Sequence, residues 1–296
     1  MRGRGYRPDP RHKRMQKDSR LLFGSAPSLK GFGSLDSFRA PVMDQGVSNS
    51  CTAHGTSQGL AIAFTASGKP LSFVVSPRGL YAVTGCLELS DVVGETLEDN
   101  GRIPSDIMVA LSTIGVEPMG PLAPDGRFSD VTPDNVNIKP RLDEVETELV
   151  TIVTGTHRID EKATDVLTQV AASIDAKCPV GVGAIVGPAF EAWGEGWDAS
   201  RPPIGVATLA ADQASGQAGG HWTVITSYQI MPDGTFEFGY LNSWGPSWGC
   251  PPMDPNIRNP TMGQYRTTGA WLQSAASDLY IFTPQLGNAQ AARKAA

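Results

Sequence analysis

The chain has 296 residues, of which 40% are hydrophobic and 18% are charged, as is ordinary for a soluble globular protein with a substantial core. No apolar run is long enough to span a membrane, and no apolar segment of signal-peptide length follows the basic N-terminus, so we expect neither a membrane span nor a secretory signal. The net charge of −6 is unevenly distributed, because residues 1–20 carry about +6 and the remainder about −12. An acidic body without a basic patch interleaved with aromatic residues argues against nucleic-acid binding.

Residues 1–40 are rich in Gly, Pro, Ser and Arg and show no hydrophobic period, which predicts an extended arm rather than a domain. A basic arm on an acidic body can lie across its own body, bind an acidic partner protein, or stay solvated. The sequence leaves these alternatives open.

Three helices are predicted in the first half, from apolar stripes at helical spacing and from capping residues. They cover about residues 51–66, 77–87 and 107–114. Together they predict a helical lobe.

The second half has mixed signals. Residues 118–140 are rich in Pro, Gly, Asp and Asn, which indicates a crossing between two lobes. A helix that is capped by Asp160 and runs to about Ile174 is then predicted to lead into a buried strand over residues 180–186. From Gly187 to Gly220 the pattern predicts a loop.

A hairpin is predicted next, with strands over residues 222–230 and 235–241 and a turn at Met231-Pro-Asp-Gly234. Its two strands bring His221 and Asn242, which are 21 residues apart in sequence, to neighbouring ends. A last strand over residues 279–283 completes a β lobe, and residues 287–296 are predicted to form a polar tail.

Cys51 is the residue with the clearest chemical signal, because it opens the first predicted helix. The partial positive charge of a helix N-terminus favours a thiolate, and the N–H groups there can receive an oxyanion. Cys86 and Cys178 are interpreted as buried thiols, and a structural role is favoured for Cys250, with a second exposed thiol as the alternative. No Cys-x-x-Cys or His-Glu-x-x-His spacing is present, so no metal site and no cofactor are expected.

Several short motifs occur in one order along the chain: Gln45 six residues before Cys51, His221 after a glycine pair, and the block Asn242-Ser-Trp-Gly245. In this combination the sequence resembles the papain-like cysteine peptidases, over about residues 41–285. The run Cys51-Thr-Ala resembles the bacterial and viral branches of that family. The resemblance implies an α+β fold with a helical left lobe, an antiparallel β-barrel-like right lobe, and an active-site cleft between them.

The resemblance also implies catalytic roles. Cys51 would be the nucleophile, His221 its base and later the acid, and Asn242 the group that orients the imidazole. The side-chain amide of Gln45 and the backbone N–H of Cys51 would form the oxyanion hole, and Trp244 would shield the Asn–His pair from water. The reaction would pass through a thioester acyl-enzyme.

A second histidine is the alternative base. His54 lies three residues after Cys51, on roughly the same helix face. A base on the same helix would aim the thiol poorly and would leave His221 without a role, so we favour packing or local hydrogen bonding for His54.

The resemblance also has implications for substrate-contacting positions, for a missing disulfide and for the N-terminal segment. Gly101 and Gly220 are predicted to contact substrate through their backbones, and Asn49 stands where a glycine commonly lets substrate approach. Ser48 replaces the cysteine of the family's usual disulfide, which fits a reducing compartment. The segment Gly5-Tyr-Arg-Pro-Asp-Pro10 resembles the leader of bacterial relatives, which implies that it could occupy the cleft and keep the enzyme latent.

The predicted organisation is a basic arm (1–40), a helical lobe with the nucleophile (41–135), a β lobe with the histidine and asparagine (136–286), and a tail (287–296). The predicted function is a cysteine endopeptidase acting on peptides or proteins. One alternative is a structural or assembly component, for example of a virus particle, in which the fold is retained and peptidase activity is secondary or lost. Another is acyl transfer on a different substrate, such as the cross-link peptides of a cell wall. The expected location is the cytoplasm or a larger, for example viral, assembly.

Overall fold

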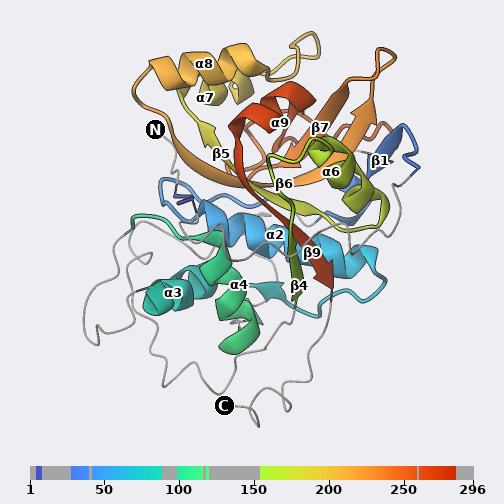
Figure 1. Ribbon diagram of the computed structural model, residues 1–296. Coiled ribbons are helices and arrows are strands. Elements are labelled where there is room, and N and C mark those ends of the chain that lie inside the picture. Colours follow the sequence, from blue (N-terminus) through green and yellow to red (C-terminus); the bar gives the residue numbers. More distant parts are fainter. Residues whose placement is uncertain are drawn as a thin grey trace.

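The computed structural model describes residues 5–8, 28–39, 42–88, 99–115, 118–119, 154–258 and 260–284. Helices α3 (Pro77–Glu88) and α4 (Pro104–Thr113) lie on one side of helix α2 (Cys51–Ala66), and the antiparallel sheet lies on the other side together with the remaining described helices (Figure 1). Most of the predicted crossing at 118–140 and the whole tail at 287–296 lie outside the described residues.

The helical lobe follows the predicted pattern. Helix α2 spans Cys51–Ala66, α3 spans Pro77–Glu88 and α4 spans Pro104–Thr113, so the three helix predictions are confirmed. The short strands β2 (Val74–Val75) and β3 (Pro118–Met119) pair beside them.

Helix α2 is buried on nearly all sides because it is the contact between the two lobes. Two glycines let it approach the sheet. A Cβ at Gly55 would lie 2.7 Å from the ring of Trp222, and one at Gly59 would lie 2.6 Å from the ring of Phe282. This close packing fixes the start of α2 against the sheet.

Within the described residues the sheet has seven strands in the order β4-β9-β5-β6-β7-β8, with β1 paired to β6, and all neighbours are antiparallel. The strands are β1 (Phe32–Ser34), β4 (Thr154–Arg158), β5 (Val180–Val186), β6 (Gly219–Ile230), β7 (Phe236–Leu241), β8 (Gln264–Thr268) and β9 (Ala276–Pro284). The predictions of the buried strand, the hairpin and the last strand are confirmed.

The sheet is open and not barrel-like, which corrects the expectation for the right lobe. Strands β4 and β8 are its two edges and do not pair with each other. Strand β8 instead forms isolated β-bridges with Ile204 and Cys250. These single-residue bridges cover part of the β8 edge, so the edge does not need to pair with β4.

Two short helices, α7 (Pro188–Gly194) and α8 (Val206–Ala214), occupy the region predicted as a loop, so that prediction was wrong. They are joined by Asp212, whose carboxylate accepts the N–H of Ala189 at 2.7 Å. This long-range contact satisfies the first turn of α7 and leaves no trace in local periodicity.

Other bounds differ in smaller ways. Helix α6 spans Val166–Asp175, so it begins later than the predicted cap at Asp160, and helix α9 (Gly269–Ala275) had no prediction. Strand β1 lies inside the predicted arm, and it pairs with residues 227–229 of β6. In the part of the chain that the structure describes, no helix is long and apolar enough to cross a membrane.

Candidate functional site

Cys51 is the first residue of α2, and its side chain is fully buried at the contact with the sheet. The main chain of Trp222 donates a hydrogen bond to its thiol, and the N–H of Gly5 lies 3.2 Å from its Sγ. Because Trp222 directly follows His221, the start of α2 and the start of β6 meet at this point.

His221 and Asn242 are joined by a hydrogen bond, as the hairpin prediction implied. His221 Nε2 lies 2.7 Å from Asn242 Oδ1, and both residues are buried. The N–H of Ser243 also donates to Oδ1, at 2.8 Å, which identifies this atom as an acceptor. Nε2 therefore carries the proton, and Nδ1 is the basic nitrogen of the neutral ring.

Trp244 covers this pair. Its ring stacks on the imidazole of His221, with centroids 4.5 Å apart and planes tilted by 28°, and it is fully buried. The ring of Phe190, from α7, contacts both in edge-on geometry. The aromatic contacts keep water away from the His221–Asn242 hydrogen bond and strengthen it.

Gln45 is held beside the same block. Its Oε1 accepts the hydroxyl of Ser243 at 2.5 Å, and its Nε2 donates to the carbonyl of Ser48 at 2.8 Å. Its backbone N–H also donates to the carbonyl of Ser243. These bonds fix the amide between the loop that precedes Cys51 and the residue that follows Asn242.

The electrostatics of Cys51 depart from the expected thiolate. Burial raises the pKa of Cys51 to about 11, although hydrogen bonds from Trp222, Gly5 and Thr52 lower it in part. At neutral pH the group is therefore a thiol in this arrangement. Burial is the largest cause of the shift and outweighs these hydrogen bonds.

Residues 5–8 of the arm run between the two lobes. The N–H of Tyr6 donates to the carbonyl of Gly220 at 3.1 Å, and the N–H of Arg7 donates to the carbonyl of Arg102 at 3.2 Å. The N–H of Arg102 returns a bond to the carbonyl of Gly5 at 2.9 Å. The arm segment is thus bracketed by one backbone from each lobe.

The weaker site predictions meet this segment in different ways. Gly220 contacts it through its carbonyl, as above. Gly101 gives its N–H to the Tyr81 hydroxyl, and the neighbouring Arg102 makes the backbone bonds. A Cβ at Gly101 would lie 1.8 Å from the carbonyl oxygen of Gly5, so a glycine is required for this approach.

Asn49 belongs to a clip that sequence reasoning missed. Its N–H donates to both carboxylate oxygens of Asp99 at 3.0 Å, and its Nδ2 donates to the carbonyl of Asp99 at 2.7 Å. The hydroxyl of Tyr81 donates to the same carboxylate at 2.8 Å. Asp99 therefore ties the loop before Cys51 to the segment that brackets the arm, and the only sequence signal was an Asn in a position expected to hold glycine.

Replacing Asp99 by alanine is expected to lower the free energy of unfolding by about 2 kcal/mol, because charge-assisted hydrogen bonds from Asn49 and Tyr81 lose their acceptor. Urea denaturation measures the change. A Tyr81→Phe variant made in both backgrounds forms a double-mutant cycle. Strictly additive effects of the two substitutions would contradict the clip.

The alternative base is engaged elsewhere. His54 is buried, and its Nδ1 lies 3.0 Å from the carbonyl of Ser50 and 3.1 Å from the Ser50 hydroxyl. Of the other cysteines described, Cys250 is buried and Cys178 is half-buried, and burial raises the pKa of Cys178 to about 11 and that of Cys250 to about 12. Among the described residues, no three His, Cys, Asp or Glu side chains gather as a metal site.

Comparison with known proteins places this arrangement in a structural context. No protein-family model and no curated protein matches the sequence. Solved structures do match. Xylellain, a cysteine protease from Xylella fastidiosa, superposes with a TM-score of 0.60 at 19% identity, covering 96% of this chain and 97% of that one.

Two further matches extend the comparison. Digestive procathepsin L 3 of Tenebrio molitor has a TM-score of 0.56 at 16% identity, covering 95% of this chain and 75% of that one. Bromelain from Ananas comosus, in complex with the E64 inhibitor, has a TM-score of 0.55 at 14% identity, covering 87% of this chain and 100% of that one. The chain therefore has a papain-like fold.

Proposed function

We propose that the chain is a cysteine peptidase that hydrolyses peptide bonds with Cys51 as nucleophile, His221 as base and Asn242 as the group that orients the base. The observation that carries the proposal is the hydrogen bond from His221 Nε2 to Asn242 Oδ1, which makes Nδ1 the basic nitrogen, together with the bond from Trp222 to the thiol of Cys51. The papain-like fold supports the same assignment.

The chemistry uses each of these groups in turn. His221 Nδ1 takes the thiol proton, and the sulfur of Cys51 forms a bond to the substrate carbonyl carbon. The oxyanion receives hydrogen bonds from Gln45 Nε2 and from the backbone N–H of Cys51. The intermediate collapses to a thioester as the amine leaves with a proton from His221.

Water completes the cycle. His221 removes a proton from water, whose oxygen attacks the thioester carbonyl, and the acid product and the free thiol are released. While His221 is protonated, Asn242 keeps the imidazolium in place through Nε2. Trp244 stacked on the ring limits the orientations that the imidazole can adopt.

The docked arm supports a latent resting state. It presents the N–H of Gly5 to the sulfur of Cys51, where a substrate would present a carbonyl carbon, so it blocks the nucleophile without offering it a bond to cleave. Backbone hydrogen bonds hold the segment to both lobes, from the N–H of Tyr6 to Gly220 in the β lobe and from the N–H of Arg7 to Arg102 in the helical lobe. Displacement of residues 5–8 is then the step that opens the site.

The test is peptide hydrolysis by the purified chain and by its Tyr6→Ala variant, in which the arm is weakened. We expect the variant to cleave a mixture of fluorogenic peptides and to lose that activity on titration with E64, with labelling at Cys51. The absence of turnover in both proteins, with a folded chain and an accessible Cys51, would overturn the proposal. It would favour the structural or assembly component, for which light scattering would then be expected to show a defined oligomer.

Asn242→Ala is expected to reduce kcat by about 10- to 100-fold with little change in KM, because the hydrogen bond orients the base and touches no substrate. Steady-state kinetics in the Tyr6→Ala background measure both constants. Asn242→Gln, which keeps the amide but misplaces it, serves as the matched variant. A loss confined to KM would show that Asn242 acts on binding.

Two finer properties concern the branch of the family and the position of the cleaved bond in the substrate. The similarity to xylellain, from Xylella fastidiosa, supports the bacterial side of the bacterial and viral branches that Cys51-Thr-Ala suggested. The enclosed segment at residues 5–8 supports cleavage within an extended chain, as an endopeptidase requires. Cleavage of an internally quenched peptide that is blocked at both ends tests the second point. Activity that needs a free terminus would contradict it.

A further inference from the structure

The side chain of Tyr6 is enclosed almost completely, with 3% of its surface exposed. Its ring lies 5.9 Å from that of Trp222, and a Cβ at Gly183 would lie 2.2 Å from its Cζ. We call these surroundings the Tyr6 pocket, and they consist of Gly183, Gly220, Trp222, Ser277 and Asp278.

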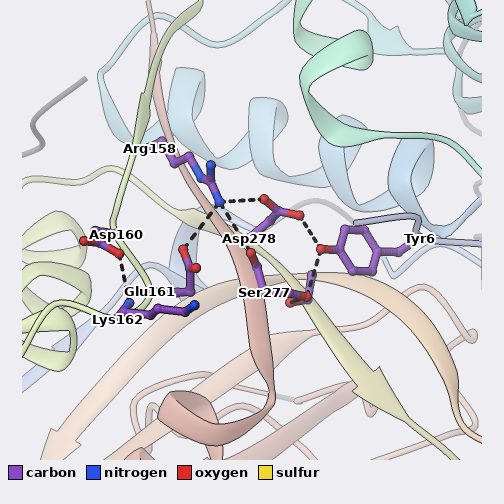
Figure 2. A network of polar contacts seen from close by, with 8 residues as sticks. Tyr6, Arg158, Asp160, Glu161, Lys162, Ser277 and Asp278 are labelled. Carbon is purple, nitrogen blue, oxygen red and sulfur yellow. Dashed lines mark hydrogen bonds and ion pairs between the residues drawn. The ribbon is translucent and has the colours of Figure 1, made fainter. Parts of the chain in front are cut away.

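The floor of the Tyr6 pocket is polar (Figure 2). The Tyr6 hydroxyl donates to Asp278 Oδ2 and lies 2.9 Å from the hydroxyl of Ser277. The single phenolic proton goes to Asp278, so the phenol oxygen can accept the proton of the Ser277 hydroxyl, which also lies 3.4 Å from the carbonyl oxygen of Gly183 as a longer alternative acceptor. The floor therefore offers one acceptor and one donor at the depth that a phenol oxygen reaches.

Asp278 is already paired on its other side. Its Oδ1 accepts from Arg158 Nη2 at 3.0 Å, and the same nitrogen lies 3.4 Å from Glu161 Oε2 (Figure 2). Asp278 is fully buried, and Arg158 is 4% exposed. The carboxylate is thus held by strand β4 from one side, and its second oxygen faces the ligand.

This geometry discriminates among side chains. A phenylalanine would fill the same volume but would offer no donor to the buried Asp278. An arginine or lysine could donate to Asp278 Oδ2, but neither can accept from the Ser277 hydroxyl. Only a group that both donates and accepts satisfies the floor, and among apolar-bodied side chains that group is the phenol of tyrosine.

We propose that the Tyr6 pocket is a tyrosine-selective subsite for peptides that bind in place of the arm, with Asp278 as the specificity-determining residue and Arg158 as its positioning residue. The proposal rests on the proposed function insofar as such peptides are substrates. The arm occupies the subsite with its own tyrosine in the resting chain.

The test uses the full chain with Tyr6→Ala, which empties the pocket, and with Cys51→Ser, which prevents turnover and keeps an acceptor for the peptide N–H. The probe is a fluorescein-labelled peptide, Gly-Arg-Gly-Tyr-Arg-Pro-Asp-Pro, which copies residues 3–10. Two further peptides carry Phe or Arg in place of the tyrosine. Fluorescence anisotropy is expected to show about 10- to 100-fold tighter binding of the tyrosine peptide than of either other peptide.

Equal affinities for the Tyr and Phe peptides, or tighter binding of the Arg peptide, would overturn the subsite. All three peptides are compared on one protein, so this result does not depend on the folding of a pocket variant. In a second receptor that adds Ser277→Ala, the advantage of Tyr over Phe is expected to shrink several-fold, because the phenol loses one partner. An unchanged ratio would show that the floor does not select the ligand.

Turnover separates this proposal from the proposed function. In the Tyr6→Ala chain with Cys51 present, a tyrosine is moved one position at a time along an alanine host peptide, and kcat/KM is compared with that for Phe at each position. Selective binding without any hydrolysis would overturn the peptidase and leave the subsite standing. Hydrolysis without a preference for tyrosine at any position would overturn the subsite alone.

Discussion

Replacing Cys51 by serine is expected to lower kcat for peptide hydrolysis by at least about 10³-fold, to the level of the background reaction. Serine keeps a hydroxyl in place of the thiol at the start of α2, but the pKa of that hydroxyl is far too high for His221 to generate an alkoxide at neutral pH. The measurement is kcat in the Tyr6→Ala background, with circular dichroism and urea denaturation to show that the chain remains folded.

The matched control is Cys178→Ser, which removes a half-buried thiol that lies outside the site and is expected to leave kcat unchanged. Retained turnover in the Cys51 variant would show that another group attacks the carbonyl. Equal losses in both variants would point to damage of the fold rather than of the chemistry.

The central part of the site could be predicted because its signals are local. The spacing from Gln45 to Cys51 fixes a loop that enters a helix, and the turn at Gly234 fixes a hairpin that makes neighbours of His221 and Asn242. Each of these arrangements is decided within about 20 residues of chain. The structure brings together the groups that these short-range patterns indicated.

The arrangement of the edges could not be predicted because it depends on long-range contacts. Helices α7 and α8 have 7 and 9 residues, too short for a helical period to stand out among Gly, Pro and Ala, and Asp212 joins them across 23 residues. The open edge at β8 is bridged by Ile204 and Cys250, which carry no recognisable strand pattern.

The Tyr6 pocket depends even more on contacts between residues that are far apart in the sequence. Asp278 lies 272 residues from Tyr6 and 120 from Arg158, so no window of sequence contains the three together. In sequence, Asp278 directly precedes the predicted strand over residues 279–283, and nothing local indicates its burial, which the ion pair with Arg158 and the hydrogen bond from Tyr6 explain. The resemblance predicted that a leader could enter the cleft, but not which side chain would anchor it.

Removing the Tyr6 side chain, which anchors the arm, is expected to change the reactivity of Cys51. Tyr6→Ala is expected to raise the rate of Cys51 alkylation by iodoacetamide at pH 7 by at least about tenfold and to shift its pH profile toward lower pH. With the arm docked, burial raises the pKa of Cys51 to about 11, so the reactive thiolate increases only as the pH rises far above neutral. Releasing the arm returns water to the sulfur and reduces the burial that is the largest cause of that shift, which we expect to outweigh the loss of the hydrogen bond from Gly5. Each unit by which the pKa falls increases the thiolate fraction about tenfold.

A single substitution is the sharper experiment here, because a truncation at residue 40 would also remove strand β1 and the buried Asp36, which accepts from Thr226 and Gln264. Peptide mapping after alkylation from pH 4 to 9 resolves Cys51 from the other cysteines. The matched control is Lys30→Ala, an exposed position of the same N-terminal region, which is expected to leave the profile unchanged. If Cys51 reacted equally fast with and without Tyr6, the arm would not be a blocker, and the raised pKa would have to come from the packing of α2 against the sheet.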